Sequence, residues 1–321
     1  MSKAEENIPW QINDLRRRLD EDEVPVFTQE TVNDVCECFK KKMSNQCANQ
    51  IFGKVPDNSK IVVVGSLYGD FGTLKRILKE YFDALLKQHI NEAGDSEKVY
   101  LVFMGNYIEH NSDSVSTIVM VMLIKVLFPT YVFLLRGETE LPNTINPLMT
   151  TRNFAKYCAE TYSDKKKAEA VYTAIIQTFD YFPITLRIGE NLFMSGSFPT
   201  PGGSTNDMND TITSKQILPL TQPTFPLISC CFNCASRYVS SGFVTNKGVT
   251  VFSTNYIAGL CDLEGIRHVF SNSDCFGSLQ IGTNVKYYCC FTGPSVLANS
   301  RGYYLISPEE NGSQVVQETL N

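Results

Sequence analysis

Histidine is scarce in this sequence, so a structural zinc site would have to rely on cysteine. The 321 residues include three histidines (His89, His110 and His268) and eleven cysteines. None of the histidines lies at zinc-finger spacing, and Cys231 and Cys234 form a C-x-x-C pair, whereas a structural zinc usually needs two such pairs. We therefore expect the cysteines to be buried, reduced thiols rather than zinc ligands.

A basic excess and long apolar runs are also missing. The formal net charge is -6 and the isoelectric point is near 5.3, which argues against a surface for polyanions, so no nucleic-acid partner is expected. No apolar run reaches membrane-spanning length, and the N-terminus is polar and acidic, without the pattern of a signal peptide. We expect no membrane association and a cytoplasmic location, a nuclear location, or both.

The most informative stretch is residues 99–140, which reads as strand, polar loop, helix, strand and polar loop. Residues 99–104 and 131–135 are apolar runs of strand length. Between them, residues 115–127 carry apolar side chains at the spacing of one helix face. This pattern predicts a βαβ unit with parallel strands, whose functional loops leave the carboxyl ends of the strands.

Similar patterns flank this unit. Residues 61–64 predict a strand and residues 74–85 a helix, while residues 10–19 and 32–39 predict N-terminal helices, with a further turn or two near Cys47 and Ile51. Residues 202–226 read as a long surface excursion, rich in turn-forming residues. Further helices are expected at 152–162 and 168–179, and further strands at 184–187, 192–194, 288–291, 302–306 and 314–317.

The loops after the first three expected strands carry a family resemblance. They read Gly-Ser-Leu-Tyr-Gly at 65–69, Gly-Asn-Tyr-Ile-Glu-His-Asn at 105–111 and Leu-Leu-Arg-Gly-Glu-Thr-Glu at 134–140. These stretches resemble the motifs of the phosphoprotein phosphatases, a calcineurin-like metallophosphatase family, and most of all those of its type-1 serine/threonine enzymes. The glycines and flanking apolar residues of the motifs are kept, while the chemical residues differ.

The resemblance implies an α/β metallophosphatase fold, in which two mixed β-sheets form a central sandwich flanked by helices. It favours a single globular domain. Residues 1–55 would form a helical N-terminal cap of that domain, and residues 56–321 the metallophosphatase-like part.

The family holds two divalent metal ions, such as Mn, Fe or Zn, and two dications need carboxylates and neutral imidazoles as ligands. Among the six matching ligand positions here, Glu138 is the sole carboxylate, and no aspartate or histidine occurs. We therefore expect no metal cofactor. The six positions hold Ser66, Tyr68, Asn106, Glu138, Gly196 and Ser273.

The positions that match the family's catalytic residues have changed as well. Thr139 replaces the histidine that acts as proton donor, and His110 and Lys247 replace two arginines without offering a planar guanidinium. Arg136 and Lys247 are candidates for a residual anion contact. The altered catalytic positions are Glu109, His110, Thr139, Lys247 and Val296.

These substitutions predict a catalytically inactive relative, a pseudophosphatase. It would act by binding protein partners, such as phosphatase regulatory subunits or phosphoprotein substrates, as a scaffold or competitor. An alternative is a metal-dependent phosphatase with a rebuilt, weak Mg²⁺ or Mn²⁺ site of Asp70, Glu109 and Glu138. A third hypothesis is anion binding without turnover through Arg136, His110 and Lys247.

Overall fold

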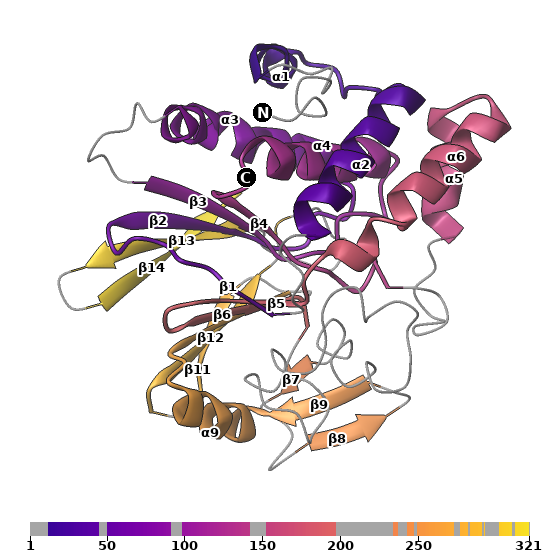
Figure 1. The fold of residues 1–321 in the computed structure, drawn as a ribbon. Coiled ribbons are helices and arrows are strands. Elements are labelled where there is room, and N and C mark those ends of the chain that lie inside the picture. The colour runs from indigo at the N-terminus through magenta and orange to yellow at the C-terminus, as the bar shows by residue number, and fades with distance from the viewer. Residues whose placement is uncertain are drawn as a thin grey trace.

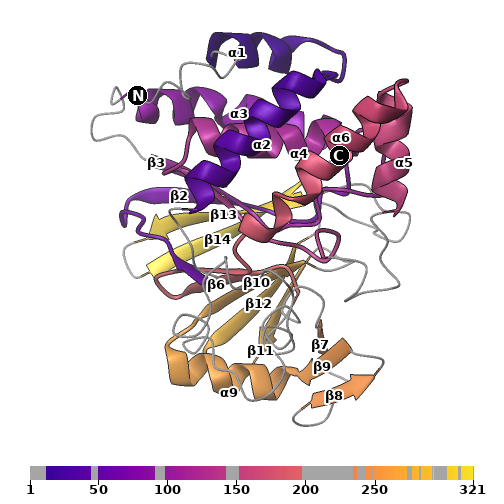
Figure 2. The same ribbon diagram turned by 45° about the vertical axis from the view of Figure 1, so that its right-hand side comes forward.

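The chain folds into two β-sheets stacked face to face, with helices on both outer faces (Figures 1 and 2). This is the α/β sandwich expected from the sequence. A computed structural model describes residues 12–44, 50–90, 98–141, 152–196, 234–236, 243–246, 249–272, 277–281, 283–290, 292, 302–309 and 312–320. Trp10 and the expected excursion at 202–226 lie outside these residues.

One sheet has five strands in the order β14-β13-β2-β3-β4 and carries most of the helices. Strands β2, β3 and β4 run parallel, and the hairpin β13–β14 extends the sheet antiparallel to β2. Figure 1 shows the N-terminal helices on its outer face. The bounds are β2 Ser59–Val64, β3 Lys98–Phe103, β4 Val132–Leu134, β13 Gly302–Glu309 and β14 Gly312–Thr319; α1 Ile12–Asp20, α2 Gln29–Ser44, α3 Phe71–His89, α4 Ser114–Leu127, α5 Arg152–Thr161 and α6 Lys165–Ile176.

The second sheet has six strands in the order β1-β5-β6-β10-β12-β11 and is covered by α9. A small three-stranded sheet, β7-β9-β8, lies beside that helix. The bounds are β1 Gln50–Phe52, β5 Thr185–Ile188, β6 Asn191–Met194, β10 His268–Asn272, β11 Gly277–Ile281 and β12 Val285–Cys290; α9 Thr254–Glu264, β7 Cys234–Ser236, β8 Phe243–Asn246 and β9 Val249–Ser253, with a 3-10 turn η1 at Phe179–Tyr181.

The alternation of side chains along β2 shows why both faces of the five-stranded sheet are buried. Val62 and Val64 pack into the core beneath the helices, whereas Ile61 and Val63 pack into the core between the two sheets. Successive residues of a strand point to opposite faces, so the run of β-branched residues serves both layers. A third core lies between the six-stranded sheet and α9.

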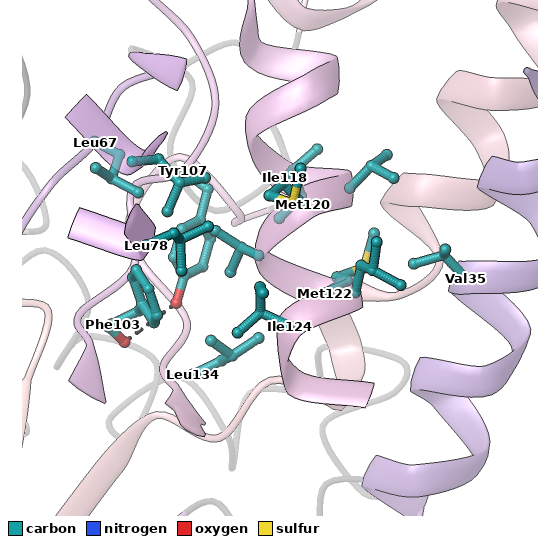
Figure 3. Close-up of a cluster of buried hydrophobic side chains, with 14 of the residues drawn as sticks. Val35, Leu67, Leu78, Phe103, Tyr107, Ile118, Met120, Met122, Ile124 and Leu134 are labelled. Carbon is teal, nitrogen blue, oxygen red and sulfur yellow. Dashed lines mark hydrogen bonds between the residues drawn. The ribbon is translucent and has the colours of Figure 1, made fainter. Parts of the chain in front are cut away.

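Helix α4 forms the centre of the helical layer. Every residue from Ser114 to Val126 is buried, as the apolar sequence of this helix predicts. Figure 3 shows Ile124 directed at Leu134 of β4 and Met122 directed at Val35 of α2. The buried Lys125 donates to the carbonyls of Pro129 and Val132 at 2.8 Å each, and thereby satisfies backbone acceptors beyond the helix end.

The expected helices and strands of the two βαβ units are confirmed within a residue or a few at each end, and so is the β5–β6 hairpin. The prediction of a helical turn reaching Ile51 is wrong. Ile51 lies in β1, which pairs in parallel with β5 through Gln50↔Thr185 and Ile51↔Leu186. Sequence reasoning also missed α9 and the strands β7, β8, β9, β10 and β11. No helix in the described ranges is long and apolar enough to cross a bilayer.

Candidate functional site

The candidate site is formed by the loops that leave the carboxyl ends of β2, β3 and β4, here called the exit loops, residues 65–70, 104–113 and 135–141. Main-chain hydrogen bonds join the first two loops directly. The amides of Leu67 and Tyr68 donate to the carbonyl of Asn106 at 3.1 and 2.8 Å, and the Gly69 amide donates to the Tyr107 carbonyl at 2.8 Å. The first two exit loops therefore form one continuous edge.

Two glycines allow the second and third exit loops to approach each other. Gly105 has a φ of +93°, a conformation that L side chains rarely adopt. A Cβ at Gly137 would collide with the backbone nitrogen and side-chain oxygen of Asn106 and would lie 2.6 Å from Oε2 of Glu140. The glycines of the motif therefore have a structural role that is independent of any chemistry.

Four side-chain-bearing residues of the exit loops adopt left-handed backbone conformations. Their φ values are 49° at Tyr68, 58° at Asn106, 77° at Glu109 and 60° at His110, and these are the non-glycine residues with positive φ in the described part of the chain. Asparagine tolerates this region, whereas tyrosine and glutamate adopt it at a cost of about 1 kcal/mol or more each. All four lie in the motif segments. Two of them are altered ligand positions and the other two are altered catalytic positions.

Three of the altered metal-ligand positions are joined to one another by hydrogen bonds. The Asn106 amide nitrogen donates to Oγ of Ser66 at 3.0 Å and to the Tyr68 hydroxyl at 3.4 Å. Its amide oxygen accepts from the Thr139 amide at 3.3 Å. Ser66 and Asn106 are buried, and Tyr68 is half-buried with its ring edge-on to His110, 4.9 Å between centroids. The structure thus brings these predicted residues together.

The third exit loop is organised by Glu140, a carboxylate that sequence reasoning assigned no role beyond the turn. Its Oε2 accepts from the amides of Asn106 and Gly137 at 2.8 and 2.9 Å, and its Oε1 accepts from the Tyr107 amide at 2.8 Å. Its Oε1 also accepts from the Thr139 hydroxyl at 2.6 Å. Burial raises the pKa of Glu140, while these four donors act in the opposite direction.

Arg136 and Thr139 are both committed to the loop itself. Arg136 is 1% exposed, and its guanidinium donates to the Glu140 carbonyl and forms a 3.2 Å ion pair with Asp180. In this position the guanidinium holds the loop rather than contacting an anion from solvent. Thr139 has no ionisable proton near neutral pH, and its hydroxyl proton is directed at Glu140.

Glu109 is the unusual acid of the second loop. It is 3% exposed, and its Oε1 has no hydrogen-bond partner among the described residues. Burial, together with the charges of Glu140 and Glu138, raises the pKa of Glu109 from its ordinary 4.5 to about 7. Glu109 therefore takes up a proton near neutral pH.

The raised pKa of Glu109 predicts a pH-dependent stability. An acid whose pKa is higher in the folded state loses stability as pH rises from its unfolded value, near 4.5, through about 7. The shift corresponds to roughly 3 kcal/mol. Glu109→Gln should therefore unfold at a higher urea concentration than the wild type at pH 8 and at a similar concentration at pH 4. Equal midpoints at pH 8 would contradict the burial argument.

Asp70 takes a different role from the one proposed for a rebuilt metal site. Its Oδ1 accepts from the Thr73 amide at 3.1 Å and its Oδ2 from the Thr73 hydroxyl at 2.5 Å, so it caps the N-terminus of α3. Within the described ranges, no three His, Cys, Asp or Glu side chains are grouped to hold a metal ion. Asp70, Glu109 and Glu138 are thus not brought together as a ligand set.

The second sheet contributes Gly196 and Asn272 to the same region. The Gly196 carbonyl accepts from the Ser271 hydroxyl, and glycine has no side chain to bind a metal. Asn272 donates its amide to the Met104 carbonyl at 2.9 Å and to Oγ of Ser195 at 3.0 Å, which ties the two sheets together at this edge. Sequence reasoning missed Asn272. Ser273, Lys247 and Val296 lie outside the described residues.

The described donor set does not fit the two divalent ions that the family resemblance implies. Two dications need several anionic or imidazole ligands, and the described ligand positions offer hydroxyls, an amide and one carboxylate. The amide of Asn106 directs its nitrogen, which cannot bind a cation, at Ser66 and Tyr68.

Comparison with known proteins supports the family resemblance. No protein-family model matches the chain. The chain is 27% identical over 179 residues to the serine/threonine-protein phosphatase PP2A-like PPG1 of Candida albicans, across 56% of this chain and 37% of that protein. It is 28% identical over 149 residues to the serine/threonine-protein phosphatase BSL2 of Arabidopsis thaliana, across 45% of this chain and 14% of that protein. The chain thus spans a minor part of both relatives.

A solved structure has the same fold over nearly the whole chain. It is a protein serine/threonine phosphatase from Saccharomyces cerevisiae, described as similar to human phosphatase PP5. The TM-score is 0.70 with 16% sequence identity, and the match covers 92% of this chain and 90% of that one. The fold expected from the motifs is confirmed.

Proposed function

We propose that this relative of the phosphoprotein phosphatases is a pseudophosphatase that binds protein partners and does not hydrolyse phosphate esters. The partners would be phosphatase regulatory subunits or phosphoprotein substrates, and the protein would act as a scaffold or competitor. The observation that supports inactivity most is the closed network of Asn106, Ser66 and Tyr68, in which ligand positions bond to one another. These three residues offer neutral hydroxyls and an amide, and none of them supplies the negative charge that would offset a dication.

The remaining parts of a phosphatase mechanism point the same way. A hydrolase of this kind needs a hydroxide made by metal ions, a proton donor for the leaving group, and cations that hold the phosphate. Thr139 directs its proton at Glu140, and Arg136 is paired with Asp180. His110, in the place of an arginine, contacts the Tyr68 ring. All three requirements are weakened together.

Support for protein binding comes from the edge of the five-stranded sheet. Strand β14 pairs with β13 through the register Gly302↔Thr319 to Glu309↔Gly312, and it is the end strand of the sheet order. Its residues Gln314 and Gln317 are exposed. An eight-residue edge strand presents main-chain donors and acceptors to which an extended peptide can add as a further strand.

Inactivity is tested with purified, untagged protein loaded with Mn²⁺ and desalted. We expect hydrolysis of a phosphoserine peptide at the rate of the blank and no dinuclear complement of Mn, Fe or Zn by elemental analysis. Asn106→Asp, which restores one ligand, should also be inactive because the other ligands are still missing. Hydrolysis that depends on Mn²⁺ and disappears in Glu138→Ala would overturn the proposal in favour of a rebuilt, weakly metal-dependent phosphatase.

Binding at the sheet edge is tested with two proline variants, Gln314→Pro and Gln317→Pro, against a panel of purified phosphatase regulatory subunits. Successive strand residues direct their amides to opposite edges, so positions three apart differ in direction. One of the two prolines therefore removes a main-chain amide that points away from β13, toward the free edge of the sheet. The other removes a main-chain hydrogen bond between β14 and β13. We expect the outward variant to lose binding while keeping the wild-type thermal midpoint. Full binding by both folded variants would exclude this edge.

A further inference from the structure

Strand β11 forms one edge of the six-stranded sheet. Among the described residues it is the end strand of that sheet, and it pairs antiparallel with β12. Its three central residues, Ser278, Leu279 and Gln280, are exposed. Leu279, at 36% exposed, is among the large apolar residues that the described chain leaves at its surface. An end strand presents its outer edge to any further strand that comes beside it.

The devices by which proteins protect an end strand are missing from β11. Its residues Gly277–Ile281 include no charged side chain and no proline. Its pairing with β12 runs one to one from Gly277↔Cys289 to Ile281↔Val285, so no bulge twists the edge away. Natural sheets use charge, proline or bulges to keep such edges from pairing with another chain. The edge of β11 is therefore open to a further strand.

We propose that the edge of β11 pairs with β11 of a second copy of this chain, in antiparallel orientation about a two-fold axis at Leu279. Leu279 is the middle residue of the five, so an antiparallel copy places Leu279 opposite Leu279 and Ser278 opposite Gln280. One strand thus supplies both sides of a closed two-fold contact. This inference goes beyond the proposed function and uses a different strand from β14.

Both faces of the paired strands would be matched. Side chains alternate along a strand, so Leu279 lies on the same face as Ile281, which packs in the core against α9 (Figure 1). The leucines of the two copies would meet on that face and continue its apolar layer across the axis. Ser278 and Gln280 lie on the opposite face, where a hydroxyl and an amide can form hydrogen bonds between strands.

The charge of the chain favours β11 as the contact between two copies. Each copy has a formal net charge of -6, so two copies repel each other. Strand β11 brings no like charge to the contact, whereas β14, the end strand of the other sheet, carries Glu318. A contact of two short strands is smaller than the roughly 1,200–2,000 Å² of stable complexes, so we expect a weak dimer that depends on concentration.

The test measures the mass of the untagged protein by sedimentation equilibrium under reducing conditions, from about 5 to about 500 µM. We expect the mass to rise from the 36.0 kDa of the monomer toward twice that value. Added salt should increase the dimer fraction, because it screens the repulsion between the two acidic chains. A monomer at every concentration would overturn the inference, and so would a dimer that salt dissociates.

Two lysine variants separate this edge from general apolar association. Leu279→Lys places two like charges at the axis and should weaken the dimer at least about tenfold. Leu263→Lys changes the net charge equally at the 85% exposed Leu263 of α9, two residues beyond the buried Cys261, and should dimerise like the wild type. Thermal midpoints confirm that both variants are folded. Equal losses in both variants, or an unchanged dimer in Leu279→Lys, would overturn the inference.

A cysteine cross-link tests the position of the axis. Directly opposite residues of antiparallel strands have Cα atoms about 4.5–5.5 Å apart, within the range that a disulfide spans. Leu279→Cys, oxidised with glutathione disulfide, should give more covalent dimer on a non-reducing gel than the wild type and Leu263→Cys. No excess would overturn pairing at Leu279. Phosphatase inactivity and partner binding through β14 are read in separate assays and do not depend on this result.

Discussion

Replacing Glu140 with alanine should lower the free energy of unfolding by about 4 kcal/mol. The carboxylate is fully buried and accepts hydrogen bonds from three backbone amides and one hydroxyl. Its removal leaves those donors buried without a partner, and each orphaned donor costs about 1–3 kcal/mol. Urea unfolding, followed by circular dichroism, measures the difference directly.

The matched control is Glu140→Gln, which keeps the shape and one acceptor oxygen. It should retain the bonds of one carboxylate oxygen and lose those of the other, so its loss of stability should be about half that of the alanine variant. An alanine variant within 1 kcal/mol of the wild type would mean that the exit loops rearrange freely, and that their described hydrogen bonds do not hold them.

The second large effect is expected at Gly137. Alanine there would place a methyl group against the backbone nitrogen of Asn106 and 2.6 Å from a Glu140 oxygen, inside the contact between the second and third exit loops. Backbone and a fully bonded carboxylate cannot yield as the end of a flexible side chain can. We expect Gly137→Ala to lower the free energy of unfolding by about 3 kcal/mol or more.

Gly259 provides the control for this substitution. It lies within α9, and apart from its chain neighbours and the nearby backbone of its own helix, no atom lies within 4 Å of the position that its Cβ would take. Gly259→Ala should stabilise the protein by up to about 1 kcal/mol, because alanine favours the helix and loses less backbone entropy. If both variants had the same thermal midpoint, steric contact at Gly137 would not be what constrains the loops.

The parts of the fold with strong local patterns could be predicted from the sequence. The β3–α4–β4 unit combines two β-branched or aromatic runs with a helical apolar period, and its connection is short. Such local signals leave few arrangements open. Strand β1 is the opposite case. Its three residues are too few to show a hydrophobic period, and the strand with which they pair, which begins at Thr185, lies far along the chain. Here long-range pairing, not local propensity, selects the strand.

The chemical character of the candidate site could be predicted from the sequence, but its geometry could not. The residue types at the motif positions showed the loss of ligands. They did not show that Asn106 would turn its nitrogen toward Ser66, or that Glu140 would bind three amides of two loops. The left-handed conformation of Asn106 had a weak signal, since asparagine often adopts it. That of Glu109 had none, because the surrounding loop imposes it.

The packing of α2 has a consequence for the order of events during synthesis. The apolar face of α2, with Val32, Val35 and Phe39 buried, packs on α4 and α6, and both follow it in the chain. Helix α2 therefore emerges from the ribosome long before the surfaces that cover it. Until residues up to Ile176 have been made, that face stays uncovered by its final neighbours, and exposed apolar surface of this kind makes a nascent chain prone to aggregation.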